Sequence, residues 1–520
     1  MTFRNGLPPG SEVTASHGAE RAAGNTEVLE THVSVLTLQG DTVWKRKKPV
    51  RFDFVDFREP RARLAACRRE LMLNRRLAPD VYLRVEESRD EKRRLLDAAV
   101  VMRRLPDRRQ LAWLIDHKVD VHGELTHVAR VLATFHAGAR RGPGVNRSGS
   151  PRALGRRWRQ DLAEWGPAAA KVLGVAGLDR ERALAERFLE ARAPLLRHRV
   201  AGGHIVDGHG DLRADSIYCL KDGPRIIDCL EFDSRLRCGD VLADVGFLAM
   251  DLEAMQRPDL AAHFVAEYQR FAGTEWPPSL LDFYIAQRAM VRSKVECLRA
   301  LQGDATAAPR ARSLLDECRR HLESARAILV VLGGAPRTGK STTALGLAAR
   351  TGWIVVHSDE VRRDVAGTAA SNGGEGGRLD RGRYAAAMTA LTYRTLADRA
   401  RTLQTGGYNV ILDATFPDSR TRLCAGRVAR DCRTDLVEIE CRVATDVVRE
   451  RASQPRRTGD LSEATPDVAA ALGARRTPWP SARVVDTSGT PDGSVAQCLR
   501  IVKETPVGLT RIPSGTHHPD

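Results

Sequence analysis

The sequence lacks any apolar run long enough to cross a membrane. Its longest, Ala327–Leu332, is far shorter than the ~20 residues that a membrane-spanning helix needs. The first residues, Met1–Ser11, contain no apolar segment of the kind found in secretion signals. We therefore expect a cytoplasmic protein without a membrane partner.

Closely paired cysteines are missing as well. The chain has 10 cysteines, and none are separated by the two or four residues that are typical of zinc ribbons and redox dithiols. No metal cluster is therefore expected. Reduced thiols in a chain without a secretion signal also fit the cytoplasm.

Lysine is scarce, because 10 of the 82 basic residues are lysine and the other 72 are arginine. The net charge of +16 is compatible with a nucleic-acid partner. The arginines are scattered, however, and a preference for arginine over lysine is typical of a genome-composition effect. We therefore favour a small-molecule partner and keep nucleic acid as the alternative.

The chain of 520 residues, 42% of them hydrophobic, is long enough for several domains. Its sequence pattern changes near residue 326, where expected apolar strands begin to alternate with expected helices. This alternation is typical of a parallel α/β sheet. Five strands are expected there, at Ile328–Leu332, Ile354–Val356, Val410–Leu412, Leu436–Cys441 and Val484–Val485. The expected divisions are a disordered N-terminus over 1–25, a strand-rich lobe over 26–110, a helical lobe over 111–325, an α/β domain over 326–505 and a flexible tail over 506–520.

A phosphate-binding loop follows the first of these strands. The run Gly334, Ala335, Pro336, Arg337, Thr338, Gly339, Lys340, Ser341 matches G-x-x-x-x-G-K-[ST]. In such a loop the backbone N–H groups and a helix N-terminus bind phosphate oxygens. We predict that Lys340 contacts the β- and γ-phosphates of ATP and that Ser341 binds Mg²⁺, with Thr342 beside them.

Carboxylates follow the next two expected strands, Asp359 after the second and Asp413 after the third. Ligands bind at the carboxyl ends of parallel strands. We therefore predict that Asp359 accepts the proton of an acceptor hydroxyl and that Asp413 binds Mg²⁺ or its waters. A helix N-cap is the alternative role for Asp359.

Two arginines are candidates for phosphate binding in the same domain. Arg362 is predicted to hold the acceptor or the γ-phosphate. Arg449 lies in the arginine-rich stretch 447–457 and is predicted to reach the transferring phosphoryl group from a closing lid. A solvated basic helix face is the alternative for that stretch. The Gly-rich segment 366–377 is expected to be a mobile loop.

The first half of the chain carries a second phosphotransfer pattern. Asp211 follows one short strand, and Asp228 ends another, expected over Arg225–Asp228, so one carboxylate is placed to take the acceptor proton and the other to hold Mg²⁺. Upstream, the runs Val33–Leu38 and Thr42–Lys47 are expected to form a β-hairpin. Lys45 and Lys47 share one face of its second strand because side chains repeat every two residues. Glu70, on the helix expected over Arg61–Leu77, is placed to pair with one of them. That order of residues is the protein-kinase plan.

These residues resemble the aminoglycoside-phosphotransferase family of kinase-like folds, whose signature is H-G-D-L-H-x-x-N followed by a strand that ends I-D-x-x. Over about residues 27–505 the chain resembles bacterial proteins in which such a domain is joined to a P-loop ATP-binding domain. The resemblance implies an α+β protein-kinase-like bilobal domain followed by an α/β P-loop domain with a five-stranded parallel sheet. It also implies that Asp211 is the catalytic base, Asp228 a metal ligand and Lys45 or Lys47 the phosphate-binding lysine.

Residues 326–505 by themselves resemble the small P-loop kinases of the gluconate-kinase, zeta-toxin and polynucleotide-kinase type. The segment Ser358–Arg362 looks like the acceptor-base segment of the polynucleotide-kinase group. The resemblance implies ATP binding and leaves the acceptor open.

The first half departs from its family signature at two positions. It reads H-G-D-L-R-A-D-S, so Arg213 replaces the second histidine and Ser216 stands where the metal-binding asparagine is expected. Ser216 is predicted as a metal ligand, but its side chain is shorter than that of asparagine and Mg²⁺ needs ligands at about 2.0–2.1 Å. The alternatives are that Ser216 contacts the metal through a water, or that the first half has a single metal, turns over slowly or only binds ATP.

Three hypotheses follow. The first is an enzyme with two ATP sites that phosphorylates a small hydroxylated acceptor, such as a sugar, an amino sugar or an aminoglycoside-like molecule. In the second, the P-loop half phosphorylates a nucleic-acid 5′-hydroxyl, which the positive charge would help. The third is a nucleotide-responsive regulatory protein whose first half binds ATP and barely turns it over. We favour the first and expect ATP and Mg²⁺ as cofactors.

Overall fold

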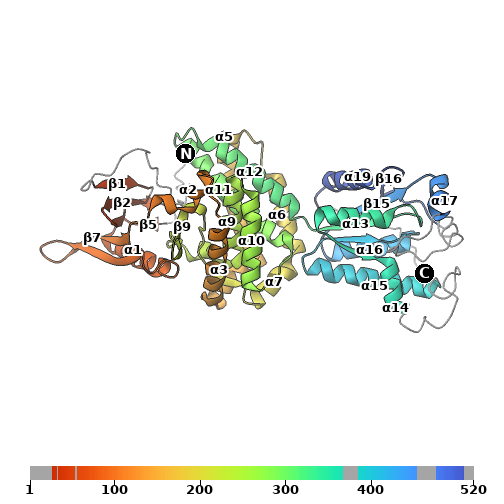
Figure 1. Ribbon diagram of the computed structural model, residues 1–520, viewed down its shortest axis with the longest axis horizontal. Helices are drawn as coiled ribbons and strands as arrows, with labels where there is room; N and C mark the ends of the chain where they lie inside the picture. The colour runs from red at the N-terminus through yellow and green to blue at the C-terminus, as the bar shows by residue number, and fades with distance from the viewer. Residues whose placement is uncertain (1–25, 32, 53–54, 367–384, 454–475, 509–520) are drawn as a thin grey trace. The chain divides into compact units, whose positions relative to one another are not determined.

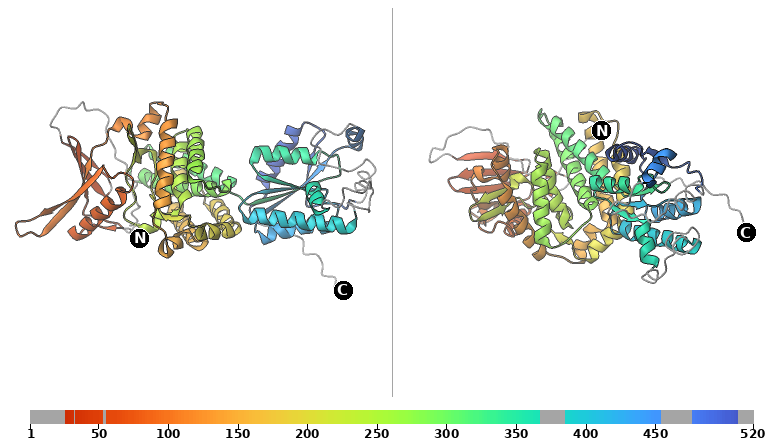
Figure 2. Two further views of the ribbon diagram at one scale, coloured as in Figure 1. Left: turned by 60° about the horizontal axis from the view of Figure 1, so that its bottom comes forward. Right: turned by 45° about the vertical axis from the view of Figure 1, so that its right-hand side comes forward.

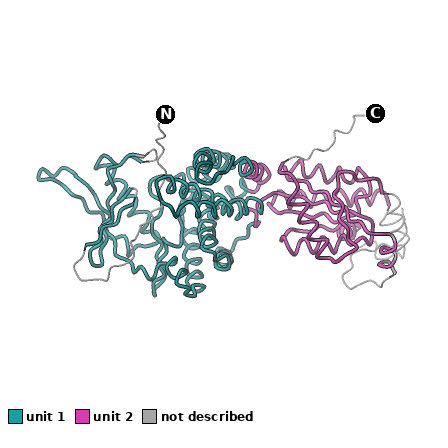
Figure 3. The backbone as a smooth tube through the Cα atoms, turned by 90° about the horizontal axis from the view of Figure 1, so that it is seen from above, with its two compact units in different colours: residues 1–182, 196–276, 280–324 teal, residues 183–195, 277–279, 325–520 magenta. Residues whose placement is uncertain are grey.

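A computed structural model of the protein describes residues 26–31, 33–52, 55–366, 385–453 and 476–508 (Figure 1). The chain forms two compact units (Figure 3). Unit 1 comprises residues 1–182, 196–276 and 280–324, and unit 2 comprises residues 183–195, 277–279 and 325–520. The expected disordered N-terminus and most of the expected mobile loop and tail lie outside the described residues.

Unit 1 begins with a strand-rich lobe. Its elements are β1 (Glu27–Glu30), β2 (Ser34–Gln39), β3 (Thr42–Lys47), β4 (Arg51–Phe52), β5 (Val55–Asp56), α1 (Pro60–Asn74), β6 (Tyr82–Arg89) and β7 (Leu95–Arg103). Five of the strands form one antiparallel sheet in the order β1-β2-β3-β7-β6. The β2–β3 turn uses Gly40 at a φ of +55°, a conformation that favours glycine.

The helix α1 covers one face of this sheet. Its buried Cys67 packs with Val81, Val100 and other buried residues into the core of the lobe, and Leu64 and Leu71 pack against that core. Pro60 begins the helix, where its fixed φ is already helical and its missing N–H costs nothing. Glu70 is also buried, as are Arg63 and Asn74 of the same helix, so polar and charged side chains lie beside this apolar core.

The remaining elements before residue 325 are mostly helices (Figure 2). They are η1 (Asp107–Arg109), α2 (Leu111–Asp116), α3 (His122–Gly138), α4 (Pro143–Asn146), η2 (Arg147–Gly149), α5 (Pro151–Leu173), α6 (Asp179–Ala191), α7 (Ala193–Ala201), β8 (Ile205–Asp207), η3 (Ala214–Ser216), β9 (Ile217–Leu220), β10 (Gly223–Ile226), α8 (Ser234–Arg237), β11 (Cys238–Asp240), α9 (Val241–Ala254), α10 (Pro258–Ala272), α11 (Pro278–Leu301) and α12 (Ala307–Ser324).

The helix α9 is the centre of this helical lobe, and almost all of its residues are buried. Asp240 caps its N-terminus by accepting a hydrogen bond from the Leu242 N–H at 3.0 Å. At Gly246 a Cβ atom would lie 3.1 Å from the backbone nitrogen of Ile285, so α9 and α11 approach each other closely there. These contacts hold α9 in place. Side chains of α9 in turn accept hydrogen bonds from the backbone of the loop before β9.

Unit 2 is built on a parallel sheet of order β13-β14-β12-β15-β16. Its strands are β12 (Ile328–Gly333), β13 (Ile354–His357), β14 (Val410–Asp413), β15 (Asp435–Arg442) and β16 (Arg483–Asp486). Its helices include α13 (Lys340–Thr351), α14 (Ser358–Ala366), α15 (Ala386–Thr405), α16 (Ser419–Asp431), α17 (Thr445–Ser453) and α19 (Pro491–Glu504). Two apolar clusters cover the two sheet faces, one towards α15 and α16 and the other towards α13 and α19. Every residue of the central β12 is buried, which explains its continuous apolar run.

The five predicted strands of unit 2 and the predicted hairpin before residue 48 are confirmed. Two expectations were wrong in detail. The helix expected to reach Leu77 ends at Asn74, whose amide donates to the Glu70 carbonyl at 2.9 Å and thereby leaves its oxygen available to another loop. The strand expected over 225–228 ends at Ile226, because Asp228 has a φ of +61°. No helix of the described residues is long and apolar enough to span a membrane.

The buried pair of Arg199 and Asp240 gives the first prediction. The guanidinium donates to both carboxylate oxygens at 2.8 and 2.6 Å, and the two side chains are 4% and 0% exposed. Arg199→Met would leave the α9 cap buried and unpaired, so we expect a loss of about 3–5 kcal/mol in the free energy of unfolding of unit 1. Urea denaturation of the intact chain followed by circular dichroism measures it.

The matched control is Arg235→Met. Arg235 pairs with Asp233 at 2.8 Å, but its side chain is 85% exposed, and we expect a loss below about 1 kcal/mol. Equal losses in the two variants would contradict the importance of the buried pair.

Candidate functional site

Two lysines of β3 meet one carboxylate of α1 in the interior of unit 1. Lys45 Nζ lies 2.9 Å from Glu70 Oε1, and Lys47 Nζ lies 2.7 Å from Glu70 Oε2. The Glu70 side chain is 1% exposed. Burial favours its neutral form, but the two ammonium groups outweigh burial and lower the pKa of Glu70 to about 2. The sequence predicted one such pair, and the structure brings both lysines to the same glutamate.

Each lysine also reaches an acidic residue that follows β10. Lys45 Nζ lies 2.7 Å from Asp228 Oδ1, and Lys47 Nζ lies 2.6 Å from Glu231 Oε1. Burial lowers the pKa of Lys45, but the charges of Asp228 and Glu70 raise it well above its usual value. Both lysines are therefore charged at neutral pH. The predicted phosphate lysine, its helix glutamate and the predicted metal ligand are thus neighbours.

The position of Asp228 is fixed by its neighbours. Its backbone N–H donates to the Tyr82 hydroxyl at 3.3 Å, and the next N–H, of Cys229, donates to Asn74 Oδ1 at 2.9 Å. Asn74 ends the same helix that carries Glu70. The helix α1 therefore holds both the glutamate and the loop on which the predicted metal ligand lies.

Asp244 of α9 holds the loop that contains Asp211. Its carboxylate accepts hydrogen bonds from the His209 N–H at 2.7 Å and the Gly210 N–H at 2.8 Å. His209 in turn contacts the Ile227 carbonyl through Nε2 at 3.0 Å, so it braces the two loops against each other. Gly210 has a φ of +86°, and a Cβ atom there would lie 3.0 Å from the Arg237 Cα; only glycine fits.

Both departures from the family signature pair with Asp215, and Arg213 also reaches Asp211. Arg213 is buried, with Nη1 2.7 Å from Asp215 Oδ2 and Nε 3.5 Å from Asp211 Oδ1. The Ser216 hydroxyl donates to Asp215 Oδ1 at 3.2 Å. Burial raises the pKa of Asp215 to about 6; Arg213 opposes this rise, and the charges of Asp251 and Asp211 add to it. A fixed guanidinium therefore lies beside the predicted base.

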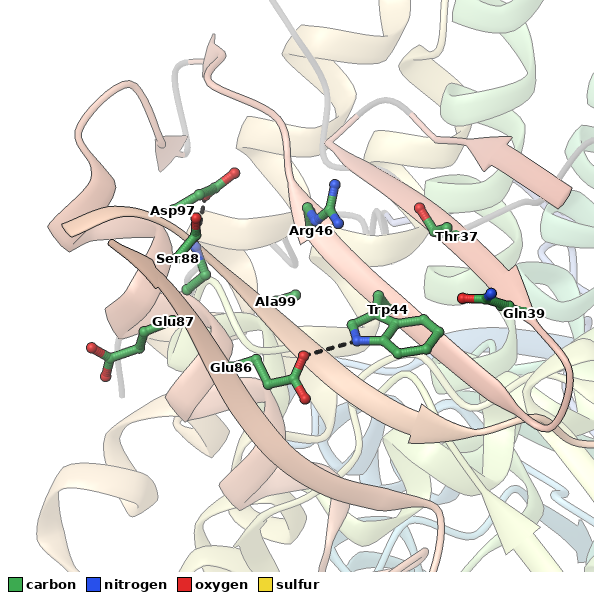
Figure 4. A pocket seen from close by; sticks show the side chains of 10 residues that line it. Thr37, Gln39, Trp44, Arg46, Glu86, Glu87, Ser88, Asp97 and Ala99 are labelled. Carbon is green, nitrogen blue, oxygen red and sulfur yellow. Dashed lines mark hydrogen bonds between the residues drawn. The ribbon is translucent and has the colours of Figure 1, made fainter. Parts of the chain in front are cut away.

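A pocket of about 380 Å³ lies on the other face of the same sheet (Figure 4). Trp44 and Arg46 line it, and they alternate along β3 with the inward-facing Lys45 and Lys47. The Trp44 indole N–H donates to Glu86 Oε2 at 2.9 Å across its floor. This pocket is therefore separate from the cluster of lysines and carboxylates.

In unit 2 two glycines with positive φ shape the loop between β12 and α13. Gly334 has a φ of +150°, and a Cβ atom there would lie 2.6 Å from the Cys441 carbonyl oxygen. Gly339, at a φ of +83°, caps α13, and Lys340 is the first residue of that helix. Lys340 Nζ donates to the Ala335 carbonyl at 3.0 Å, and Thr338 Oγ1 donates to the same oxygen at 2.8 Å. Pro336 and Arg337 form the tip of this loop, and Thr342 lies exposed in the first turn of α13.

Arg337 has a φ of +67°, which is rare for a residue with a side chain and costs about 1–3 kcal/mol. Such strain is concentrated at functional loops in proteins. The loop therefore keeps a fixed, uncommon backbone shape in the stretch that would surround phosphate groups.

Asp413 is the centre of the polar cluster at the carboxyl ends of the strands. Its Oδ2 accepts a hydrogen bond from Ser341 Oγ at 2.6 Å and lies 2.8 Å from His357 Nδ1. Burial favours the neutral carboxyl, but His357 and Lys340 outweigh it and lower the pKa of Asp413. The two predicted metal ligands of this unit are therefore in contact, and their oxygen donors suit Mg²⁺.

The other predicted residues of unit 2 lie on nearby helices. Asp359 is the second residue of α14, which begins at Ser358 directly after β13, so it lies in the first turn of the helix and not at its N-cap. Arg362, one turn later, donates from Nη1 to Thr389 Oγ1 at 3.4 Å. Arg449 belongs to α17, but its side chain lies outside the described residues. Arg451, on the same helix, donates to the Thr487 carbonyl at 2.7 Å.

Sequence reasoning missed two residues of these clusters, Glu231 and His357, and the pairing of Arg213. Glu231 follows Asp228 by three residues, and His357 ends β13 in register with Asp413 of β14. That register could have been inferred, because neighbouring parallel strands end at the same sheet edge. The pairing of Arg213 with two aspartates gives no sequence signal beyond its departure from the family signature.

Burial of Glu70 gives a second prediction. Glu70→Gln keeps the shape and removes the charge between two buried ammonium groups, so we expect a loss of about 3–5 kcal/mol in the free energy of unfolding at neutral pH. The pKa of Glu70 is lowered from 4.5 to about 2 on folding, so its contribution is complete above pH 4.5 and is lost as the pH falls through 2. The difference in the free energy of unfolding between wild type and variant, measured by urea denaturation, should narrow as the pH falls over that window.

The control is Glu87→Gln, which removes a more exposed pair with Arg68. A loss of stability in this control as large as that in Glu70→Gln would contradict the importance of the buried glutamate.

The sequence of the chain matches two family models. The phosphotransferase enzyme family matches residues 37–280, and an AAA domain family matches residues 329–479. These matches confirm the predicted fold class of a kinase-like domain followed by a P-loop domain.

Among solved structures, the chain is similar to a choline/ethanolamine kinase family protein from Mesorhizobium loti, with 15% identity, a TM-score of 0.38 and coverage of 58% of this chain and 88% of that chain. It is also similar to the APS kinase of Mycobacterium tuberculosis, with 19% identity, a TM-score of 0.26 and coverage of 34% and 98%.

Full-length relatives occur in mycobacteria. Uncharacterized protein Rv2004c of Mycobacterium tuberculosis (strain ATCC 25618 / H37Rv) and Uncharacterized protein Mb2027c of Mycobacterium bovis are each 41% identical to this chain over 475 residues, which cover 91% of this chain and 95% of the relative. The chain belongs to the same family as these proteins, and in it a domain of the phosphotransferase enzyme family precedes a kinase-like AAA P-loop domain.

Proposed function

We propose that the protein is an ATP-dependent phosphotransferase with two nucleotide sites, which transfers the γ-phosphate to a small hydroxylated acceptor such as a sugar or an amino sugar. One observation carries the proposal: each unit combines a buried lysine with a carboxylate. In unit 1 Lys45 Nζ lies 2.7 Å from Asp228 Oδ1, and in unit 2 the charge of Lys340 helps to lower the pKa of Asp413, which bonds Ser341 at the end of the glycine-containing loop. Both pairs supply what phosphoryl transfer needs, a cation for the phosphates and an oxygen ligand for Mg²⁺.

In unit 2 the backbone of the loop from Gly334 and the N-terminus of α13 would bind the phosphates of ATP. Lys340 would leave the Ala335 carbonyl and neutralise the β- and γ-phosphates. Ser341 and Asp413 would hold Mg²⁺, which neutralises charge on the phosphate oxygens when bound. Asp359 would accept the proton of the acceptor hydroxyl.

Arginines complete the proposed site of unit 2. Arg362 would hold the acceptor or the γ-phosphate, and Arg449 would stabilise the charge of the transferring phosphoryl group. Catalysis would then consist mainly of orientation and electrostatic stabilisation. Orientation alone can lower the activation barrier by about 7–11 kcal/mol.

In unit 1 the same division of labour applies. Lys45 would bind phosphate while Glu70 keeps its ammonium in place, and Asp228 would hold Mg²⁺ together with Ser216. Asp211 would take or orient the acceptor proton. Lys47, paired with Glu231, supports Glu70 from the other side.

Arg213 favours a second candidate for unit 1, an ATP-binding module with little turnover. Its guanidinium contacts the predicted base, and the Ser216 hydroxyl is already used by Asp215. In that case unit 2 transfers the phosphate, to a small molecule or to a nucleic-acid 5′-hydroxyl, and unit 1 responds to the nucleotide.

Acceptor-stimulated ATP turnover tests which unit transfers phosphate. We expect Lys340→Ala to lower turnover about 10²-fold or more, because it removes a cation aimed at developing phosphate charge. Amino sugars and a 5′-hydroxyl oligonucleotide serve as acceptors, and Lys503→Ala, on α19, is the control. Loss in Asp211→Ala alone would place transfer in unit 1. Activity unaffected by both changes would contradict the proposal.

Restoring the family residue tests the departure at Ser216. In a Lys340→Ala background, Ser216→Asn supplies the longer amide arm, and we expect Mg²⁺-dependent ATP turnover to rise about tenfold. Ser216→Ala should not raise it. If neither variant differs from the background while nucleotide binding persists, unit 1 is a binding module.

A further inference from the structure

Three titratable side chains converge in the helical lobe, apart from the loops of Asp211 and Asp228. They are Glu253 at the end of α9, and Glu317 and His321, which are one turn apart on α12. One ligand atom from each lies within 4.8 Å of the others. Glu317 and His321 share a helix face because they are four residues apart.

The buried carboxylate of Glu317 is the unusual member. The residue is 5% exposed, and its Oε1 atom has no hydrogen-bond partner among the described residues. Buried side-chain oxygens are almost always paired. Glu317 therefore brings a buried carboxylate with an unpaired oxygen to this cluster.

His321 is oriented as a metal-binding histidine is. Its Nδ1 lies 2.7 Å from Asp282 Oδ1 of α11, so its Nε2 is directed at Glu253 Oε2, 3.1 Å away. A carboxylate behind the histidine fixes the ring and raises its basicity as a ligand. The separation of Nε2 and Oε2 is close to the ~3.3 Å edge of a tetrahedron around a metal with bonds of about 2.0 Å.

We propose that Glu253, Glu317 and His321 bind one divalent first-row transition-metal ion in unit 1. The imidazole nitrogen favours Zn²⁺ or Co²⁺ over Mg²⁺, which prefers oxygen ligands. The chain supplies three ligands, and solvent completes the coordination, since Glu253 is only half-buried.

Without a metal the charges of this cluster are balanced by protons. Burial lowers the pKa of His321, but its hydrogen bonds to Asp282 and Glu253 outweigh burial and raise it to about 9. Burial and the charge of Glu253 raise the pKa of Glu317 to about 8, with Asp251 adding to the rise and His321 and Arg320 opposing it. Binding a metal at pH 7 therefore releases protons from both groups.

Arg320 competes for one ligand. Its Nη2 donates to Glu253 Oε2 at 2.8 Å, but its side chain is 55% exposed. An exposed ion pair contributes little, so Arg320 can turn into solvent when a metal takes its place.

A metal here would join α9 to α12. The same α9 carries Asp244, which holds the His209–Gly210 backbone, and Asp251, whose Oδ2 accepts from the Ala214 N–H at 2.8 Å. The metal would therefore stabilise the helix on which the loop of Asp211 depends. The site itself does not depend on the proposed phosphotransfer.

Cobalt titration of the intact, chelator-treated chain tests the proposal, with Mg²⁺ in large excess and visible absorption as the readout. We expect one Co²⁺ per chain, displaced by Zn²⁺. Glu317→Gln and His321→Asn should each weaken binding at least tenfold. Asp316→Asn, an exposed acid of the same helix, and Ser341→Ala, in the loop of unit 2, should not change it.

Thermal unfolding separates a lost ligand from a lost fold. Zn²⁺ should raise the melting temperature of the wild type and leave that of a folded Glu317→Gln variant unchanged. Absence of Co²⁺ binding in the wild type would overturn the proposal. Binding of equal strength in Glu317→Gln and His321→Asn would overturn it as well.

Discussion

The contacts between the strand-rich lobe, the helix α1 and the segment after β10 in unit 1 depend on the neutralisation of one buried carboxylate. Glu70 lies between Lys45 and Lys47 with almost no exposure, and a charge left alone there would cost several kcal/mol. Each lysine extends the pairing to the segment after β10, through Asp228 and Glu231. The strand-rich lobe, the helix α1 and that loop are therefore held by one ionic network, and the residues expected to meet a nucleotide are arranged by it.

Unit 2 reaches a comparable arrangement by other means. Its parallel strands end at one sheet edge, so Asp413 and His357 are neighbours by register, and Ser341 meets Asp413 from the start of α13. Glycines shape the loop, because a Cβ atom at Gly334 would collide with the Cys441 carbonyl. Both units thus place a lysine and a carboxylate beside a loop, one through buried ion pairs and the other through sheet geometry.

The sequence predicted the features that depend on local pattern. The apolar runs gave the five strands of unit 2, period-two alternation placed Lys45 and Lys47 on one face, and fixed spacing identified the loop from Gly334 to Ser341. Features set by long-range packing were not accessible. The polar edge strand β6 has little apolar alternation, the positive φ of Asp228 ended a predicted strand early, and the triple of Glu253, Glu317 and His321 joins residues more than sixty positions apart.

The central claim is that one chain holds two nucleotide sites. Calorimetric titration with a non-hydrolysable ATP analogue and Mg²⁺ tests it directly, because the stoichiometry counts sites irrespective of the acceptor. The account predicts two equivalents per wild-type chain, and one equivalent in either Lys45→Met or Lys340→Ala when the variant remains folded. A single equivalent in the wild type, abolished by one of the two changes and unaffected by the other, would contradict it.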